Sequence, residues 1–311
     1  MKGIVTKSTG SWYTVRAEGG ESYDCRLKGK FRTKGIKSTN PVAVGDKVEF
    51  KQEDEANVIF KLEPRENYII RKSINLSKQT HIIAANVDQA FLFVTLKLPE
   101  TSLEFIDRFL VSAEAYHIPT KLIFNKIDIY DEEEIKMIRF IQSIYTKIGY
   151  ECFEVSAEKQ INLAVIEELL KDKITMLSGH SGVGKSTLIN QLDPELDLRT
   201  LAISEANKSG MHTTTFAEMH PLVFGGDIID TPGIKGFGLV DLNKNELSRF
   251  FPEMLKVLKN CKFHNCKHIK EPGCAVLEQL NKNIFSVSRY QSYLAMFLED
   301  EDSSYRKNNY Q

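Results

Sequence analysis

The strongest chemical signal in the chain is a glycine-rich loop that could bind phosphate. Residues 179–186 have the sequence Gly-His-Ser-Gly-Val-Gly-Lys-Ser, which matches the pattern G-x-x-x-x-G-K-[ST]. The loop follows a predicted strand over 174–177 and precedes a predicted helix over 187–192, so backbone N–H groups and the positive end of the helix dipole would face the phosphates. We expect Lys185 to contact the β- and γ-phosphates and the Ser186 hydroxyl to coordinate Mg²⁺. The predicted nucleotide-binding residues here are Gly179, His180, Ser181, Gly182, Val183, Gly184, Lys185, Ser186 and Thr187.

A second motif predicts which base is bound. Residues 125–128 have the sequence Asn-Lys-Ile-Asp and follow an apolar segment that predicts a strand over 120–124. Guanine presents its N1–H and 2-amino donors side by side, and the carboxylate of Asp128 can accept from both, whereas adenine lacks this arrangement. Lys126 can lay its alkyl stem along the base, and Asn125 can hold the loop together. An isolated Asn-Lys-x-Asp can be a solvated turn, but its place after an apolar strand favours guanine recognition.

The two motifs occur in a circularly permuted order. In Ras-like GTPases the phosphate loop comes first, whereas here the base-recognition motif (125–128) precedes the phosphate loop (179–186). Ser156-Ala157 lies between them and suits the supporting loop whose backbone N–H contacts the guanine carbonyl. The parallel sheet can still form, because the permutation joins old termini that lie close together in space.

The groups that would bind the metal and respond to the γ-phosphate come after the phosphate loop. Thr213, Thr214 and Thr215 stand where a switch threonine contacts Mg²⁺, and Thr214 is the ligand that we expect. Asp230-Thr-Pro-Gly233 follows a predicted strand, so Asp230 can hold the water shell of Mg²⁺ and the Gly233 N–H can contact the γ-phosphate. The segment after this motif moves with the state of the γ-phosphate in such enzymes. Since it leads into a cysteine-rich region, we expect hydrolysis to be coupled to whatever that region contacts.

Clustered cysteines near the C-terminus predict a metal site. The pattern Cys261-x4-Cys266-x-His268-x5-Cys274 supplies three thiolates and one imidazole, a closed set that suits structural zinc. His264 is an alternative ligand, because spacing alone does not choose between the two histidines.

The composition is that of a globular protein. The chain has 311 residues, a net charge of −1 and 42% hydrophobic residues. It contains no apolar run long enough to span a membrane, and its first residues lack the apolar core of a signal peptide. We therefore expect a cytoplasmic protein with no membrane partner. In a reducing compartment, clustered cysteines favour a metal over disulfides, and the isolated Cys25 and Cys152 are interpreted as ordinary thiols.

Three regions of the chain differ in their patterns. Residues 1–70 contain short alternating segments separated by glycine turns, which predict an all-β barrel or sandwich with strands over 11–16, 22–27, 47–51 and 56–62. Residues 71–243 alternate between strand and helix patterns, with helices predicted over 132–148 and 163–170, and this alternation predicts a parallel α/β sheet. One of these helices is expected to begin with a capping box, Thr101-x-x-Glu104. Residues 244–311 predict short helices around the cysteines.

A basic stretch in the first region could bind nucleic acid. Between residues 26 and 37 the chain has six basic residues and no acidic one, namely Arg26, Lys28, Lys30, Arg32, Lys34 and Lys37. Such a local excess of positive charge matters for nucleic acid even when the net charge is close to zero.

Together these residues resemble one family, the circularly permuted small-ribosomal-subunit GTPases called RsgA or YjeQ. The resemblance covers nearly the whole chain, and the strings Gly-Met-His-Thr-Thr-Thr (210–215) and Glu-Pro-Gly-Cys (271–274) add to it. It implies an N-terminal barrel of the oligonucleotide-binding (OB) type over 1–70, a circularly permuted P-loop GTPase domain over 71–243 and a helical zinc-binding domain over 244–311. It also selects His268 over His264.

The same resemblance implies what the protein does. It implies hydrolysis of GTP to GDP and phosphate, slow in isolation and stimulated by the small ribosomal subunit, in the late maturation of that subunit. The barrel and the zinc-binding domain would contact ribosomal RNA.

One position differs from Ras-like enzymes. Ile234 follows Gly233, where Ras-like enzymes carry the glutamine that orients water. The resemblance implies that the family shares this hydrophobic residue, and it offers His212 as the candidate catalytic substitute, since histidine has a suitable pKa. The alternative is that His212 is an exposed loop histidine.

Two other classes of function also fit parts of the sequence. A P-loop ATPase or small-molecule kinase would use the phosphate loop, but Asp128 argues against it. A non-enzymatic RNA-binding module would not need Lys185, Ser186 and Asp230. We therefore predict a GTP hydrolase that uses Mg²⁺ with its nucleotide and holds one structural Zn²⁺, and nothing in the sequence demands more than a monomer.

Overall fold

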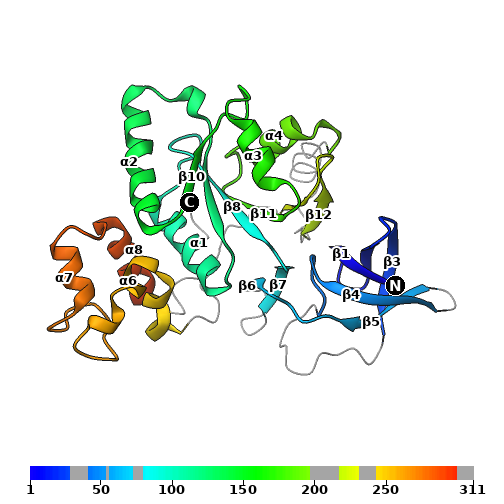
Figure 1. Cartoon of the computed structure of the whole chain (residues 1–311), viewed down its shortest axis with the longest axis horizontal. Coiled ribbons are helices and arrows are strands. Elements are labelled where there is room, and N and C mark those ends of the chain that lie inside the picture. The colour runs from blue at the N-terminus through cyan, green and yellow to red at the C-terminus, as the bar shows by residue number, and fades with distance from the viewer. Residues whose placement is uncertain (29–40, 54–55, 73–79, 197–216, 231–242, 300–311) are drawn as a thin grey trace, which may run out of the picture.

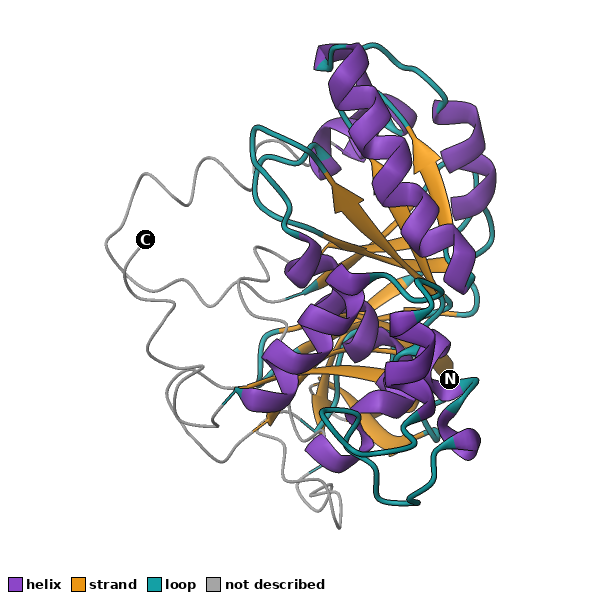
Figure 2. Ribbon diagram, turned by 90° about the vertical axis from the view of Figure 1, so that its left-hand side faces the viewer, coloured by secondary structure: helices purple, strands orange, loops and turns teal. Residues whose placement is uncertain are grey.

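The computed structural model describes residues 1–28, 41–53, 56–72, 80–196, 217–230 and 243–299. Figure 1 shows a central sheet with helices beside it, an N-terminal group of strands on one side and a C-terminal group of short helices on the other. Figure 2 shows the molecule from the side, with the long helices standing beside the central strands in its upper part. Among the described helices, none is both long and apolar enough to cross a membrane.

The N-terminal strands close into a barrel. They are β1 (Lys2–Ser8), β2 (Tyr13–Ala17), β3 (Ser22–Leu27), β4 (Lys47–Glu53) and β5 (Ala56–Leu62). β1 pairs with both β2 and β4, and β3 pairs in parallel with β5, so the order β1-β2-β3-β5-β4 returns to β1. The side chains that fill the barrel are Val5, Tyr13, Val15, Cys25, Val42, Val48, Phe50 and Ile59. This closed five-stranded order confirms the predicted OB-type barrel.

Two details of the barrel refine the sequence analysis. β1 was not among the predicted strands, because only Val5 and Ser8 of its seven residues are buried and its apolar pattern is therefore weak. Cys25 is buried in the barrel, and burial raises the pKa of its thiol to about 11, as expected for an ordinary unreactive cysteine.

The central sheet has the predicted parallel α/β pattern. Its strands lie in the order β10 (Glu151–Glu154), β9 (Thr120–Phe124), β8 (Gln89–Val94), β11 (Ile174–Ser178), β13 (Asp227–Asp230) and β12 (Glu218–Pro221). The pairings from β10 to β13 are parallel, and β12 is antiparallel to β13. Every residue of β8 is buried, because helices cover both faces of the sheet at that strand.

Helices on opposite faces explain the two apolar layers beside the sheet. α1 (Leu103–Ala115) and α2 (Glu132–Ile148) pack on one layer through side chains such as Phe109 and Tyr145. α3 (Leu163–Leu170) and α4 (Lys185–Leu192) pack on the other layer through Ile166 and Leu188. Figure 1 shows the first pair of helices to the left of the strands and the second pair to the right.

The start of α1 corrects one prediction. Ser102, not Thr101, is the N-cap residue, since its hydroxyl accepts a hydrogen bond from the Phe105 N–H at 3.2 Å. The Thr101 hydroxyl instead accepts from the Thr95 N–H at 3.1 Å and so shapes the loop before the helix. A true capping box is present at α2, between Asp131 and Glu134.

A two-stranded sheet that the sequence analysis missed lies between the barrel and the central sheet. It consists of β6 (Tyr68–Lys72) and β7 (Thr80–Ala85), which pair in antiparallel fashion. The barrel also contacts the central sheet directly. β1 pairs with β12, and Arg16 of β2 forms a bidentate ion pair with Asp227 of β13, both N–O distances being 2.7 Å.

The C-terminal region contains short helices and no strand among its described residues, as predicted. Its regular helices are α6 (Pro252–Leu255), α7 (Ala275–Asn281) and α8 (Val287–Leu298), and short 3-10 turns lie at Lys244–Phe250 and Leu258–Asn260. Further 3-10 turns occur earlier, at Ile127–Ile129 and Pro194–Leu196. α8 packs against α1, which joins the C-terminal region to the central domain.

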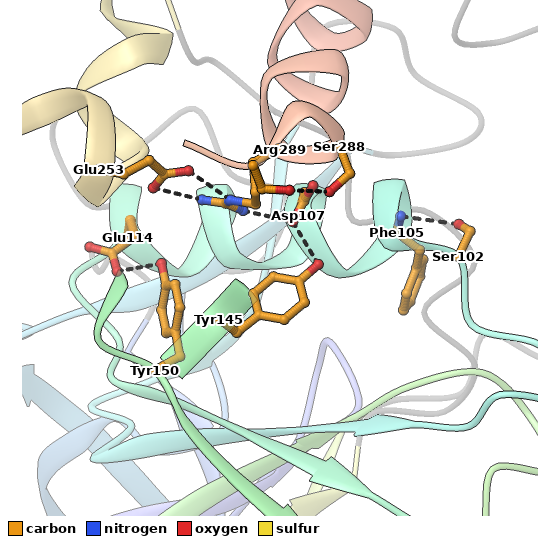
Figure 3. Close-up of polar contacts among 10 residues, drawn as sticks. Ser102, Phe105, Asp107, Glu114, Tyr145, Tyr150, Glu253, Ser288 and Arg289 are labelled. Atoms are coloured by element: carbon orange, nitrogen blue, oxygen red, sulfur yellow. Dashed lines mark hydrogen bonds and ion pairs between the residues drawn. The ribbon is translucent and has the colours of Figure 1, made fainter. Parts of the chain in front are cut away.

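A buried charge network lies at this junction (Figure 3). The Arg289 guanidinium of α8 donates to Asp107 of α1 at 2.7 Å and to Glu253 of α6 at 2.8 Å. Asp107 also accepts from the Tyr145 hydroxyl at 2.9 Å. Burial alone lowers the pKa of Arg289, but the carboxylates of Asp107 and Glu253 outweigh it and raise that pKa well above its ordinary value. Removal of Arg289 would leave Asp107 and Glu253 buried without a positive partner.

Candidate nucleotide site and metal centre

The phosphate loop turns sharply between β11 and α4, and its glycines are required by the backbone. Gly179 has φ +136° and Gly184 has φ +99°, conformations that residues with a Cβ rarely adopt. A Cβ on Gly179 would lie 2.9 Å from the carbonyl oxygen of Phe93, and one on Gly184 would lie 2.2 Å from Nδ2 of Asn125. The loop therefore has the glycine-dependent shape that the sequence pattern predicts.

Lys185 begins α4 and turns back over the loop. Its ammonium donates to the carbonyl oxygens of Gly179 at 2.9 Å and His180 at 3.0 Å. Burial lowers the pKa of Lys185, and the nearby carboxylate of Asp230 acts in the opposite direction. Asp230 ends β13, in register with Leu177 of β11. The structure thus brings the lysine of the phosphate loop and the predicted metal-binding aspartate to adjacent strand ends.

The Asn125 side chain connects three loops. Its amide nitrogen donates to the carbonyl oxygen of Val183 in the phosphate loop at 2.8 Å, and its amide oxygen accepts from the Ala157 N–H at 3.0 Å. Asn125 is 1% exposed, so both hydrogen bonds are shielded from water. The role predicted for this residue, holding the loop together, therefore extends to the phosphate loop and to the Ser156-Ala157 loop.

The other residues of the base-recognition motif lie at the end of β9. The Ser156 hydroxyl donates to Asp128 Oδ1 at 2.5 Å and accepts from the Lys159 N–H at 3.0 Å. These bonds orient the Asp128 carboxylate. Lys126 has φ +68° and its ammonium donates to the carbonyl oxygen of Leu98. The sequence analysis missed Leu98, since nothing in its type or spacing relates it to the motif.

Several predicted site residues lie outside the described part of the chain. They are the switch residues His212, Thr213, Thr214 and Thr215, together with Gly233 and Ile234. The same holds for Lys30, Arg32, Lys34 and Lys37 of the basic stretch. Ser186 and Thr187 are described and lie in the first turn of α4.

The predicted metal ligands come together in the C-terminal region. The ligand atoms of Cys261, Cys266, His268 and Cys274 all lie within 4.8 Å of one another. The His268 Nδ1 lies 3.7 Å from the Cys261 Sγ and 3.4 Å from the Cys274 Sγ. His264 is exposed and does not join this group. Three sulfurs and one imidazole nitrogen fit the closed tetrahedral set of a structural zinc site.

The segment around His268 is shaped by its own hydrogen bonds. Glu271 accepts from the backbone N–H groups of Lys267 at 2.8 Å and Ile269 at 2.9 Å. Burial raises the pKa of Glu271, but the backbone donors outweigh it and lower that pKa to about 2. The Tyr290 hydroxyl of α8 donates to the carbonyl oxygen of His268 at 2.7 Å. Burial also lowers the pKa of His268, which favours the neutral imidazole that a metal requires.

Comparisons with known proteins agree with this architecture. The family model described as RsgA GTPase matches residues 62–240, and the one described as RsgA N-terminal domain matches residues 2–59. The chain is 54% identical to the small ribosomal subunit biogenesis GTPase RsgA of Christiangramia forsetii, with 100% of both chains covered. It is 53% identical to the protein of that name from Bacteroides fragilis strain YCH46, with 98% of this chain and 99% of that one covered.

Solved structures show the same likeness. YjeQ from Thermotoga maritima matches with a TM-score of 0.75 at 35% identity, covering 95% of this chain and 96% of its own. YloQ, a circularly permuted GTPase, matches with a TM-score of 0.74 at 29% identity, covering 97% of this chain and 95% of its own. The base-recognition motif that precedes the phosphate loop, the closed N-terminal barrel and these matches lead to one conclusion: the chain belongs to the RsgA GTPase family.

Proposed function

We propose that this protein hydrolyses GTP in the late maturation of the small ribosomal subunit. The observation that carries the proposal is the pair of hydrogen bonds made by the Asn125 side chain, to Val183 and from Ala157. These bonds hold the guanine-selective motif against the phosphate loop, although the motif comes first in the chain. The ribosomal part of the proposal is supported by relatives that cover the whole chain and are named small ribosomal subunit biogenesis GTPases.

Within the nucleotide site, we assign guanine recognition to Asp128, whose carboxylate is oriented by Ser156. Lys126 lies along the base, and Asn125 and Ala157 fix the loop. Phosphate binding falls to the loop Gly179–Thr187 through its backbone N–H groups and Lys185. Mg²⁺ would neutralise charge on the phosphates, held by Ser186 and by the residues proposed as its other ligands, Thr214 and Asp230. Gly233 would contact the γ-phosphate, and His212 is proposed to orient the attacking water.

The flanking regions are proposed to contact ribosomal RNA. In the barrel, the Arg26 guanidinium lies 4.0 Å from the centre of the Trp12 ring, and Trp12 is 40% exposed. A positively charged group beside an exposed aromatic face suits a base and its phosphate. In the C-terminal region, Cys261, Cys266, His268 and Cys274 are proposed to hold one Zn²⁺ that stabilises the fold without taking part in hydrolysis. We propose that the protein acts as a monomer in the cytoplasm.

The proposal is tested by hydrolysis assays on the purified protein. GTP and ATP are each supplied with small subunits, with large subunits or with neither. We expect a GTP-specific rate on the order of 10⁻⁴ to 10⁻² s⁻¹ without ribosomes, as for unassisted GTPases, and a large increase with small subunits only. Fast GTP turnover without ribosomes, or an equal response to large subunits, would contradict the ribosomal role.

The RNA contact has its own test. Replacing the six basic residues of the 26–37 stretch with glutamine should weaken binding to small subunits and reduce its dependence on salt, because phosphate contacts release counterions. An unchanged affinity and salt slope would remove the stretch from the proposal.

A further inference from the structure

The segment Thr95–Thr101 joins β8 to α1 at the carboxyl ends of the parallel strands. β8 lies between β11, which leads into the phosphate loop, and β9, which leads into the base-recognition motif. The helices that follow β8 and β11 pack on opposite faces of the sheet. In open α/β sheets, ligands bind beside the carboxyl ends of strands at such a position. A side chain on this segment is therefore close to both halves of the nucleotide site.

Two contacts fix the segment against the nucleotide-binding motifs. On one side, the Lys126 ammonium donates to the carbonyl oxygen of Leu98. On the other side, Pro99 adjoins the phosphate loop, since a Cβ on Gly182 would lie in ordinary contact with Pro99 Cδ at 3.7 Å. The Leu98-Pro99 pair thus connects the base-recognition motif to the phosphate loop.

Hydrogen bonds within the protein determine the shape of the segment. The Thr95 N–H donates to the Thr101 hydroxyl at 3.1 Å, and the Thr101 N–H donates to the Thr95 carbonyl oxygen at 2.9 Å. The Leu96 N–H donates to the Tyr130 hydroxyl at 3.0 Å, and that hydroxyl lies 3.3 Å from the carbonyl oxygen of Asn125. The position of Leu98 is therefore set in advance by contacts with the base-recognition motif.

Leu98 itself has two unusual properties. The residue is 70% exposed, the largest fraction among the exposed large hydrophobic residues of the described part of the chain. Its φ is +57°, in the left-handed region that a leucine rarely adopts. Such strained positions cluster at ligand-binding sites, where the surrounding structure holds them in place. Core packing does not explain a leucine that points into solvent in this conformation.

We propose that Leu98 is a further nucleotide-binding residue, whose side chain contacts the guanosine part of the bound nucleotide beside the stem of Lys126. The inference rests on the proposed guanine site, because Lys126 is there assigned to the base. The Leu98 carbonyl holds the Lys126 ammonium and so directs its stem, while the Leu98 side chain adds apolar contact to the ribose and base. The phosphates lie on the side of Gly182, so the contact is the same for GDP and GTP.

The test is a titration of the full-length protein with fluorescent GDP and with a fluorescent non-hydrolysable GTP analogue. Leu98→Ala should weaken both by about five- to tenfold, the loss expected for roughly 50 Å² of apolar contact. Leu98→Met, which keeps an apolar side chain, should remain within about twofold of wild type. Leu298→Ala is the matched control, because Leu298 is 65% exposed at the end of α8.

The outcomes distinguish a failure of the Leu98 contact from a failure of the proposed GTPase function. The contact is supported if Leu98→Ala loses affinity equally for the two nucleotides and Leu98→Met keeps the affinity of wild type. An affinity equal to that of Leu298→Ala, or a loss confined to the GTP analogue, overturns it. A wild-type protein that binds neither nucleotide would contradict the proposed function instead, and the same titration measures this first.

Discussion

The Asn125 amide donates to the carbonyl oxygen of Val183 at 2.8 Å, although 58 positions separate the two residues and the base-recognition motif comes first. The permutation therefore changes the order of the motifs along the chain and leaves their contact in space intact. Strand order explains how, because β9 and β11 both flank β8 in a parallel sheet and their carboxyl ends meet at one edge. A guanine site needs this proximity, whereas it does not need a particular chain order.

Replacement of Asn125 with alanine should weaken binding of GDP by about 30- to 150-fold. The change removes two buried hydrogen bonds and leaves their partners, the Val183 carbonyl and the Ala157 N–H, without them, at a cost of about 2–3 kcal/mol. Titration with fluorescent GDP measures the effect. Asn245→Ala is the control, since Asn245 is exposed and far along the chain in the C-terminal region. Equal affinities of the two variants would show that the Asn125 bonds do not organise the site.

Replacement of Arg289 with methionine should destabilise the junction between α8 and α1. Asp107 and Glu253 would remain buried and unpaired, which typically costs about 3–5 kcal/mol. Urea denaturation, monitored by far-UV circular dichroism, measures the change in the free energy of unfolding. Arg249→Met, at an exposed ion pair with Glu246, should change it by less than about 1 kcal/mol.

A second variant distinguishes the charge effect from a loss of packing. Adding Asp107→Asn and Glu253→Gln to Arg289→Met removes the uncompensated charges and should recover much of the lost stability. A triple variant as unstable as the single one would mean that the Arg289 side chain acts mainly through its packing.

The metal centre predicts a difference between two histidines. His268→Ala should lower the zinc content well below one equivalent per chain, because the imidazole lies within the ligand group. His264→Ala should leave the content unchanged, because His264 is exposed and outside that group. Zinc is measured by elemental analysis after exhaustive dialysis. Loss of zinc from the His264 variant with retention in the His268 variant would reverse the assignment.

Glu271 should contribute stability that depends on pH. Its pKa is lowered to about 2 in the folded protein, while an unfolded glutamate has a pKa of about 4.3. A lowered carboxyl pKa stabilises the fold above the unfolded value, and this contribution is lost as the pH falls through the folded value. The difference in urea midpoint between wild type and Glu271→Gln should thus be present at pH 6 and shrink between about pH 4.5 and pH 2.

Another glutamate of the C-terminal region provides the control for this prediction. Glu278 is fully exposed and pairs with Lys282, so Glu278→Gln should change the midpoint little at any pH. If the difference in urea midpoint between wild type and Glu271→Gln stayed constant down to pH 2, the ionised carboxylate of Glu271 would not be what stabilises the segment.

The sequence predicted the parts of the fold whose patterns are strong. The boundaries of α2 and α3 agree with the prediction, because α2 has a capping box at Asp131 and a terminal Gly149 with φ +114°, and both helices alternate apolar and polar residues at helical spacing. β1, β6 and β7 were missed, since such short strands carry little periodic signal; in β1, for example, only Val5 and Ser8 are buried. The closure of the barrel through β1 and β4 could not be read from either strand alone.

The sequence also predicted part of the candidate site. Asn125, Lys185 and the three cysteine ligands follow patterns in which residue type and spacing carry the chemistry, whereas only the resemblance to the family selected His268 over His264. Leu98 belongs to no such pattern. Its place beside Lys126 depends on how β8 and β9 pair and on the path of the loop before α1, which only three-dimensional structure supplies.

The measurement that tests the guanine site most directly is a change of nucleotide preference in Asp128→Asn. An asparagine amide would present a donor to the guanine N1–H and 2-amino donors, whereas xanthine carries a carbonyl acceptor in place of the 2-amino group. The variant is assayed for hydrolysis of GTP and XTP with small subunits present, beside wild type. We predict that it loses GTP hydrolysis and gains subunit-stimulated XTP hydrolysis. A variant that still prefers GTP would contradict the role of Asp128 and, with it, the guanine specificity on which the account rests.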